Sequence, residues 1–445
     1  MKKISILLCL MICVLFALVG CNNETQGGPT EPTEDIVVDP YANIDKSNIY
    51  GIDEPVLETI SNSLALENGK YRYTVNGFDM EITADLMGMM GVKSMRFRIP
   101  QSFMTTAGQY DEEAYNYLKN AIKLLKDAGV ELLIGLLDYF PTDTAFVPDS
   151  NRSVPHLDDP AYDEWMNSLT ALCESTCKLF PEITIWEMGN EMNSTNFFHP
   201  NGYNKVSGSI SGAGTSGGFE YEEQVQIYTD YMYYAAKGIH KANSKNKAFT
   251  SGFAFTTPGS YASIEYFIRD FYDIIKNGQA PSNVATSKRS TNPRDYFDGF
   301  CWHPYVPSGK GISKDWLEGN NKIYKAVIDN GDEGLPVAFT EFGFHDDGDP
   351  ELEEIQTEYM QTAYNYMIND MPYVISCCAF RMYQCNFATS WGGAYQNYWG
   401  YFTENTSETN GIEPRQKALA LQQLYGGQGD LYKYADCYKW WKKYI

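Results

Sequence analysis

Two stretches of the chain decide the fold: residues 186–193, Trp-Glu-Met-Gly-Asn-Glu-Met-Asn, and residues 339–343, Phe-Thr-Glu-Phe-Gly. Each continues a short β-forming run and carries an acidic side chain near its end, Glu191 in the first and Glu341 in the second. In β/α barrels the reactive groups lie at the carboxyl ends of parallel strands. The two stretches therefore predict two strands of one sheet whose acids meet at the same edge.

The rest of the chain, from about residue 48 onward, repeats this unit. Short runs rich in β-branched and aromatic residues alternate with amphipathic helical stretches. The predicted strands cover residues 48–53, 94–99, 131–137, 183–188, 248–255, 297–302, 337–340 and 374–382. Strands separated by helices must run parallel, because a crossover is needed to return to the same sheet edge.

The clearest helices cover residues 222–241, 352–366 and 414–424, together with a stretch that places Ala114, Leu118, Ile122 and Leu125 on one face. Eight strand–helix units with long loops would close into a (β/α)8 TIM barrel with elaborated βα loops. The competing architecture is an open doubly wound sheet. No Gly-rich dinucleotide loop follows the first predicted strand, which favours the barrel.

Composition restricts the partners of this protein. The 445 residues are 43% hydrophobic and 20% charged, too apolar for a disordered chain and too polar for a multi-span membrane protein. A net charge of −23 would repel a phosphate backbone, so we expect no nucleic acid or polyanionic polysaccharide as partner. A neutral, hydroxyl-rich ligand fits better with the 34 Tyr, 23 Phe and 8 Trp.

The first 46 residues read as an export signal and a tether. Two lysines precede an apolar run that is short for a membrane span, and the run ends in Leu-Val-Gly-Cys at Cys21. This ending resembles the lipobox of bacterial lipoproteins, which implies cleavage after residue 20, lipidation of Cys21 and a lipid anchor on the extracytoplasmic face of the cell membrane. An ordinary signal peptide is the alternative. Residues 21–46 read as an acidic, flexible tether, which leaves 47–445 as the catalytic domain.

The ends of the predicted strands carry a narrow set of polar side chains. Arg96 and Arg98 end the second strand, His303 and Tyr305 follow the sixth, and the two glutamates of the opening stretches follow the fourth and end the seventh. Two carboxyl groups facing each other across a barrel mouth suit glycoside hydrolysis, which needs one protonated and one ionised carboxyl beside the scissile bond.

These residues resemble the clan A glycoside hydrolases, especially family 5 and, more loosely, family 39. The resemblance rests on Asn190-Glu191 after strand four, on Glu341 at the end of strand seven and on the His303-x-Tyr305 pattern of strand six, and it spans residues 48–426. It implies a retaining enzyme in which Glu191 is the general acid/base and Glu341 is the nucleophile. The substrate would be a β-linked glycan: β-glucan, β-mannan or xylan.

The resemblance also implies supporting roles. Asn190 would bind the 2-hydroxyl of the sugar, Tyr305 would hydrogen-bond the nucleophile, and His303 would help to shape the subsite. Arg98 would sit beneath the nucleophile and keep it ionised, and Trp391 would be the aromatic platform under the sugar.

The sequence departs from the family pattern in three places. Met192 replaces the usual Pro or Val, Thr184 occupies a normally aliphatic position, and the third strand ends without the histidine of many family members. We expect Glu187 to be a buried partner of Arg96 or Arg98 rather than a catalytic group. We expect neither a cofactor nor a metal, since the histidines lack clear metal-ligand spacing. The rivals are a non-catalytic glycan-binding lipoprotein on a degenerate barrel and a metal-dependent barrel hydrolase.

Overall fold

The computed structural model describes residues 39–53, 65–67, 70–72, 80–99, 108–138, 140–204, 217–255, 261–277, 289–306, 311–383, 398–404 and 412–435. The chain divides into two units, Met1–Asp39 and Pro40–Ile445, and the described helices and strands belong to the second. The predictions for the signal segment, for Cys21 and for Trp391 lie outside the described residues.

Eight parallel strands close into a barrel, which confirms the predicted (β/α)8 architecture. Each strand pairs with the next in sequence, and the first pairs with the last in the register Tyr50↔Cys377 to Asp53↔Phe380. The barrel strands are β1 (Tyr50–Asp53), β4 (Ser94–Arg98), β5 (Leu132–Leu137), β6 (Ile185–Met188), β7 (Lys247–Phe253), β8 (Gly299–Trp302), β9 (Val337–Phe342) and β10 (Val374–Phe380).

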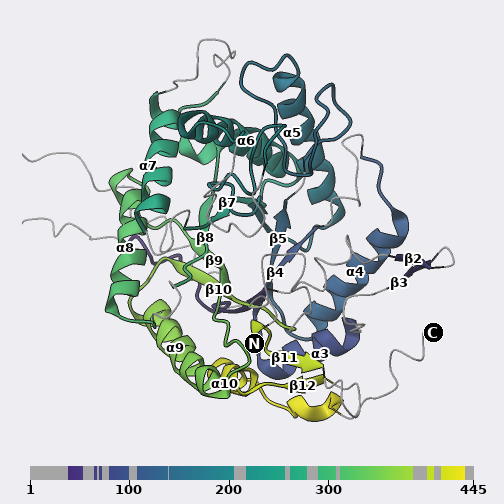
Figure 1. Ribbon diagram of the computed structural model, residues 1–445, viewed down its shortest axis with the longest axis vertical. Coiled ribbons are helices and arrows are strands. Elements are labelled where there is room, and N and C mark those ends of the chain that lie inside the picture. The colour runs from purple at the N-terminus through teal and green to yellow at the C-terminus, as the bar shows by residue number, and fades with distance from the viewer. Residues whose placement is uncertain are drawn as a thin grey trace, which may run out of the picture. The chain divides into compact units, whose positions relative to one another are not determined.

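Helices follow the barrel strands in alternation and lie around the outside of the strands (Figure 1). They are α3 (Met80–Met90), α4 (Glu112–Asp127), α5 (Tyr162–Leu179), α6 (Tyr221–Ala242), α7 (Tyr261–Asn277), α8 (Lys314–Asp329), α9 (Pro350–Asn369) and α10 (Gln416–Tyr425). The predicted face of α4 is buried at Ala114, Leu118, Ile122 and Leu125, as its spacing requires.

Short elements decorate this frame. Two hairpins pair β2 (Ala65–Glu67) with β3 (Lys70–Arg72) and β11 (Phe402–Glu404) with β12 (Ile412–Pro414). Two 3-10 turns, η3 (Pro293–Asp295) and η5 (Leu431–Tyr434), complete the assignment. Because Pro414 belongs to β12, the helix that we predicted from residue 414 begins two residues later.

The apolar core has two parts. A large cluster packs the helices on the strands, and a small separate one is formed by strand residues Ile134, Ile185, Phe249, Cys301, Ala338 and Cys378. Along a strand, residues two apart share a face, so Glu187 lies on the same side as Ile185, and Thr340 on the same side as Ala338. The polar groups of the strand ends are therefore stacked on this small cluster.

The folded unit begins earlier than residue 47. Lys46, which we assigned to the tether, donates from Nζ to the carbonyls of Met367 (2.7 Å), Ile368 (2.9 Å) and Met371 (2.9 Å). These carbonyls lie at the end of α9, where a helix has unsatisfied acceptors and its dipole favours a cation. Residues 40–46 are thus part of the barrel unit.

Within the described ranges, no helix has the length and apolarity that crossing a membrane requires. The described cysteines, at positions 173, 177, 301, 377 and 378, are buried free thiols.

Candidate active site

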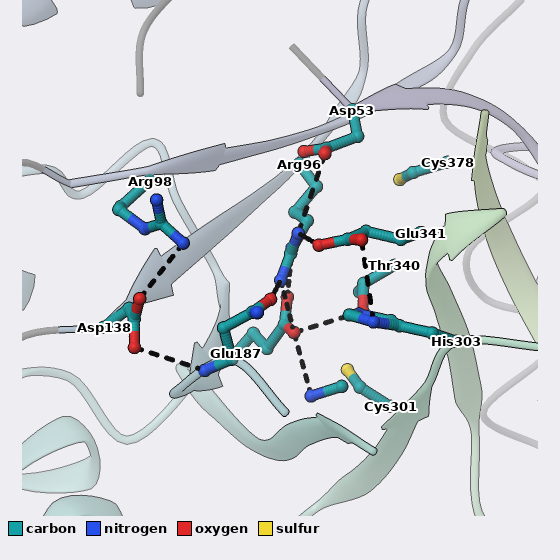
Figure 2. A network of polar contacts seen from close by, with 12 residues as sticks. Asp53, Arg96, Arg98, Asp138, Glu187, Cys301, His303, Thr340, Glu341 and Cys378 are labelled. Atoms are coloured by element: carbon teal, nitrogen blue, oxygen red, sulfur yellow. Dashed lines mark hydrogen bonds and ion pairs between the residues drawn. The ribbon is translucent and has the colours of Figure 1, made fainter. Parts of the chain in front are cut away.

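One guanidinium lies at the centre of the carboxyl ends of the strands. Arg96, in β4, is 2% exposed and donates from Nη1 to Glu341 Oε1 (2.6 Å). It also donates from Nε and Nη2 to Glu187 (2.7 and 2.9 Å) and from Nη2 to Asn190 Oδ1 (2.6 Å). Figure 2 shows this side chain pointing between Glu187, Glu341 and Asp53. A single cation on β4 therefore organises groups from three other strands, β1, β6 and β9.

The arginine beneath the nucleophile candidate is Arg96, not Arg98 as we predicted. Arg98 Nη2 lies 3.0 Å from Asp138 Oδ2 and is turned away from Glu341 (Figure 2). The two arginines are two residues apart on one strand and share its face, but Arg96 sits one pleat deeper in the barrel. Only the deeper position reaches Glu187 and Glu341 together.

Glu187 is a buried partner of Arg96, as the sequence predicted. It is fully buried and, besides Arg96, accepts from Thr340 Oγ1 (3.1 Å) and from the backbone N–H of Gly252 (2.9 Å). Gly252 is needed here, because a Cβ at this position would lie 2.7 Å from Glu187 Oε1 and 2.1 Å from His303 Nε2. Four hydrogen bonds satisfy this carboxylate and explain how it tolerates burial.

Asp53, at the end of β1, is a third carboxyl group around the same guanidinium. It is 4% exposed, and its Oδ2 lies 3.7 Å from Arg96 Nη1, the atom that also donates to Glu341. Burial, with further contributions from the charges of Glu341 and Glu187, raises the pKa of Asp53 to about 7 despite the opposing effect of Arg96. Sequence reasoning missed this residue, although it ends the predicted first strand.

Glu341 is held in its ionised form. Burial opposes ionisation, but the charges of His303 and Arg96 and hydrogen bonds from Arg96 and Tyr305 outweigh it and lower the pKa of Glu341. Tyr305 donates to Glu341 Oε2 at 3.1 Å, the contact that we predicted for it. Glu341 is thus an ionised and oriented carboxylate with 14% of its side chain exposed, and such a group is suited to act as a nucleophile.

Glu191 has a different environment. Its side chain is 20% exposed, and Oε1 lies 2.9 Å from Nδ1 of the fully buried His303. The residue has a φ of 49°, a left-handed conformation that is uncommon for a non-glycine residue and is found disproportionately at functional sites. A bond of 3.2 Å from its backbone N–H to Gly252 O fixes this turn. Because of this turn, Glu191 lies just after β6 and not within the strand.

His303 links the two glutamates. Its Nδ1 is 2.9 Å from Glu191 and 3.7 Å from Glu341 Oε2. Burial alone would lower the pKa of His303, but both carboxylates outweigh it and the pKa is raised. One carboxylate oxygen of each glutamate and this nitrogen all lie within 4.8 Å of one another. The two acids therefore face a common point.

Those three atoms are also the group among the described residues that could hold a metal ion. Glu341 is already bonded to Arg96 and Tyr305. A metal ion bound here would compete with both residues for the oxygens of Glu341.

Of the remaining predicted residues, some lie in the site and others do not. Asn190 lies in the site, where Arg96 occupies its amide oxygen and leaves the amide N–H groups as donors. Asp138 accepts from the backbone N–H of Asn190 (3.4 Å) and pairs with Arg98. A further aromatic residue beside the site is Trp399, whose ring centroid is 5.4 Å from that of Tyr305. Trp391, the predicted platform, lies outside the described residues.

The comparisons with known proteins concern the fold. No family model matches the sequence, and no curated protein sequence matches it. Among solved structures, the β-glycosidase BGL167 aligns with 88% of this chain and 98% of its own at a TM-score of 0.56 and 13% identity. This chain and that β-glycosidase therefore share the barrel fold.

Two further solved structures have the same fold over a similar share of the chain. A β-glycosidase from the hyperthermophile Thermosphaera aggregans has a TM-score of 0.54 at 14% identity and covers 86% of this chain and 97% of its own. A rice β-glucosidase mutant, solved in a covalent complex with Glc, has a TM-score of 0.54 at 14% identity and covers 86% of this chain and 98% of its own. The shared architecture extends over nearly the whole barrel.

Proposed function

We propose that this protein is a retaining glycoside hydrolase that cleaves a β-linked glycan by double displacement. Glu191 is the general acid/base and Glu341 the nucleophile. The observation that carries the proposal is a pair of carboxyl groups with oxygens within 4.8 Å of each other, of which Glu341 accepts from Arg96 and Tyr305 and Glu191 is bonded to His303. Retaining enzymes place the two groups about 5–5.5 Å apart, whereas inverting enzymes leave about 6.5–9.5 Å for a water.

In the first step, Glu341 Oε2 attacks the anomeric carbon while Glu191 gives its proton to the departing glycosidic oxygen. The C–O bond to the leaving group breaks and a glycosyl ester forms on Glu341. Arg96 and Tyr305 keep the carboxylate ionised and aimed before attack. In the second step, Glu191, now ionised, takes a proton from water, whose oxygen attacks the same carbon and releases Glu341.

His303 gives the acid/base residue its orientation. Its Nδ1 can donate to Glu191 only while it carries a proton, and Glu191 must hold its own proton on the other oxygen, toward the leaving group. The position of Asn190 beside both Glu191 and Arg96 is consistent with a donor to the 2-hydroxyl of the sugar. These contacts support the roles that the family resemblance implies.

The substrate class follows from charge and from the architecture of similar proteins. A chain with a net charge of −23 favours a neutral glycan, and β-glucan, β-mannan and xylan all meet this requirement. The structural neighbours that are named β-glycosidases or β-glucosidases, one of them with glucose bound covalently, favour a β-linkage.

The deciding experiment removes the nucleophile and replaces it chemically. Glu341→Gly should abolish release of nitrophenol from aryl β-glycosides, and azide should restore turnover with an α-glycosyl azide, the product of inverted configuration. Glu354→Ala, on the exposed face of α9, is the matched control and should behave like the unmodified protein. If neither the unmodified protein nor the rescued variant turns over any glycoside or polysaccharide on a broad panel, the protein is a glycan-binding module instead.

A second variant tests the acid. Glu191→Ala should slow substrates with poor leaving groups by orders of magnitude and activated aryl glycosides far less, because only the former need protonation. An equal loss on both substrates contradicts the assignment. Full activity in a chelator would exclude the metal-dependent rival.

We also propose that the protein is a lipoprotein anchored through Cys21 on the extracytoplasmic face of the membrane. The Leu-Val-Gly-Cys ending of the apolar run supports this. Globomycin, which blocks lipoprotein signal cleavage, should cause a larger precursor to accumulate. An unchanged mature band would rule out acylation.

A further inference from the structure

A buried cluster of four charged side chains lies beside the site but outside the Arg96 network. We name it the clasp: Asp346 after β9, Glu353 in α9, Arg415 before α10, and Lys417 in α10. Their side chains are between 0 and 10% exposed. Two acids and two bases balance one another, yet burying such a cluster gives little net stability. Its contacts indicate what else it does.

The internal contacts of the clasp are close. Asp346 Oδ2 receives Arg415 Nη2 at 2.7 Å and Lys417 Nζ at 2.9 Å. Glu353 receives Arg415 Nη2 at 3.1 Å and the backbone N–H of Lys417 at 3.0 Å. The first turn of α10 is thereby fixed to the loop that follows the nucleophile strand.

Both cations of the clasp also contact one short segment, residues 398–400. Lys417 Nζ donates to Tyr398 O (3.0 Å), and Arg415 Nη1 donates to Tyr398 O (3.4 Å) and Gly400 O (3.2 Å). The carbonyls on both sides of Trp399 are therefore held by the clasp. Two cations fix the backbone that carries this single indole.

Trp399 depends on that backbone for its position. Its Nε1 is buried and has no hydrogen-bond partner among the described residues, so no polar bond of its own orients the ring. The ring packs against Tyr305 (centroids 5.4 Å), Phe380 (5.5 Å) and His345 (5.3 Å). Tyr305 in turn donates to Glu341. A continuous set of contacts runs from Lys417 to the nucleophile.

We propose that Asp346, Arg415 and Lys417 are positioning residues of the glycosidase site: they fix segment 398–400 so that Trp399 holds Tyr305, and through it Glu341, in register with the sugar. This inference rests on the proposed function. None of the three touches the reacting atoms; they act through Trp399.

The charge state of Lys417 gives the proposal a pH signature. Burial and the neighbouring Arg415 lower the pKa of Lys417 to about 8, against the pull of Asp346 and Glu353. The ring of Tyr401 lies 5.5 Å from the same Nζ. Above this pH Lys417 loses its positive charge, and its hydrogen bond to the carbonyl of Tyr398 weakens.

The experiment is a double-mutant cycle on an aryl β-glycoside. Lys417→Met should lower kcat/KM about tenfold, since small misplacements at a reacting centre are costly, and Lys417→Arg should restore most of it and extend activity to higher pH. In a Trp399→Ala background, Lys417→Met should have almost no further effect. Lys433→Met, which breaks the half-exposed pair with Asp85 (2.7 Å), is the control and should leave kcat/KM unchanged.

Equal losses from Lys417→Met in both backgrounds would overturn the proposal, because a general loss of stability acts with or without Trp399. If the unmodified protein hydrolyses no glycoside, the proposed function fails and fluorescence still tests the clasp. The Trp399 signal is the difference between each protein and its Trp399→Phe counterpart. Lys417→Met should make this signal more accessible to acrylamide than Lys433→Met does, and unchanged quenching refutes the proposal.

Discussion

Replacing Asp53 by Asn should make the fold more resistant to alkaline pH, which is unusual for the loss of a buried ion-pairing group. Three carboxyl groups surround the Arg96 guanidinium, and Asp53 has the fewest contacts of the three: one of 3.7 Å. Below its raised pKa, Asp53 is therefore the carboxyl group that carries a proton. Asn has nearly the same shape as the protonated acid and does not ionise.

The magnitude follows from linkage. The pKa of Asp53 is raised from 3.8 to about 7 in the folded protein, chiefly by burial. A raised pKa gives stability that is complete below the unfolded value near 4 and is lost as the pH rises through 7. Between pH 5 and pH 8 this amounts to roughly two pKa units, or about 3 kcal/mol of unfolding free energy.

The assay is equilibrium urea unfolding at pH 5 and pH 8. The stability of Asp53→Asn relative to the unmodified protein should rise by about 3 kcal/mol between the two values. Taking this difference cancels the other titrating groups. Asp315→Asn, at an exposed position in the first turn of α8, is the control and should show no comparable rise. If the difference stays constant within about 0.5 kcal/mol, Asp53 is ionised at both pH values and the reasoning is refuted. The proton would then be carried by another group of the site.

Three more predictions concern the same network. Arg96→Met should destabilise the protein by about 3–5 kcal/mol, because Glu187 and Glu341 lose their buried partner. Arg98→Met, which removes the ion pair with Asp138, should cost clearly less in thermal unfolding, and equal costs would contradict the geometry. His303→Asn removes the first of the groups that lower the pKa of Glu341, so the acid limb of kcat/KM should move to higher pH, and an unmoved limb would exclude that coupling. Gly252→Ala places a Cβ 2.1 Å from His303 Nε2 and should cost about 1–3 kcal/mol as well as activity; a fully active, equally stable variant would show that the two strands can move apart.

The barrel could be predicted from the sequence because its signal is local and repeated. Alternating short apolar runs and amphipathic helices do not depend on distant contacts, and all eight predicted strands are present within a few residues. The strand that we predicted over residues 337–340, with Glu341 at its end, continues to Phe342, because Phe342 still pairs with Ala379 of β10. Pairing of this kind depends on the partner strand and cannot be seen in one segment.

The two glutamates were predicted because a strand end followed by an acid is also a local pattern. The sequence did not predict which of Arg96 and Arg98 contacts Glu341. Both arginines lie on one face of β4, and only their depth in the barrel differs. Asp53 was missed for a related reason: its importance arises when β1 closes against β4 and β10. Lys417 contacts the backbone beside Trp399 only because α10 packs back against this segment. A short window of sequence gives no information on such packing.

The contact of Lys46 with the end of α9 has a practical consequence. The carbonyls that it caps precede β10, so they lie at the amino ends of the strands, opposite the edge that bears Glu191 and Glu341. The polypeptide thus enters the barrel through its base. A fusion partner or an immobilising tag placed upstream of Pro40 would join the molecule at that base, and a long, insoluble polymer could still approach the opposite rim unhindered.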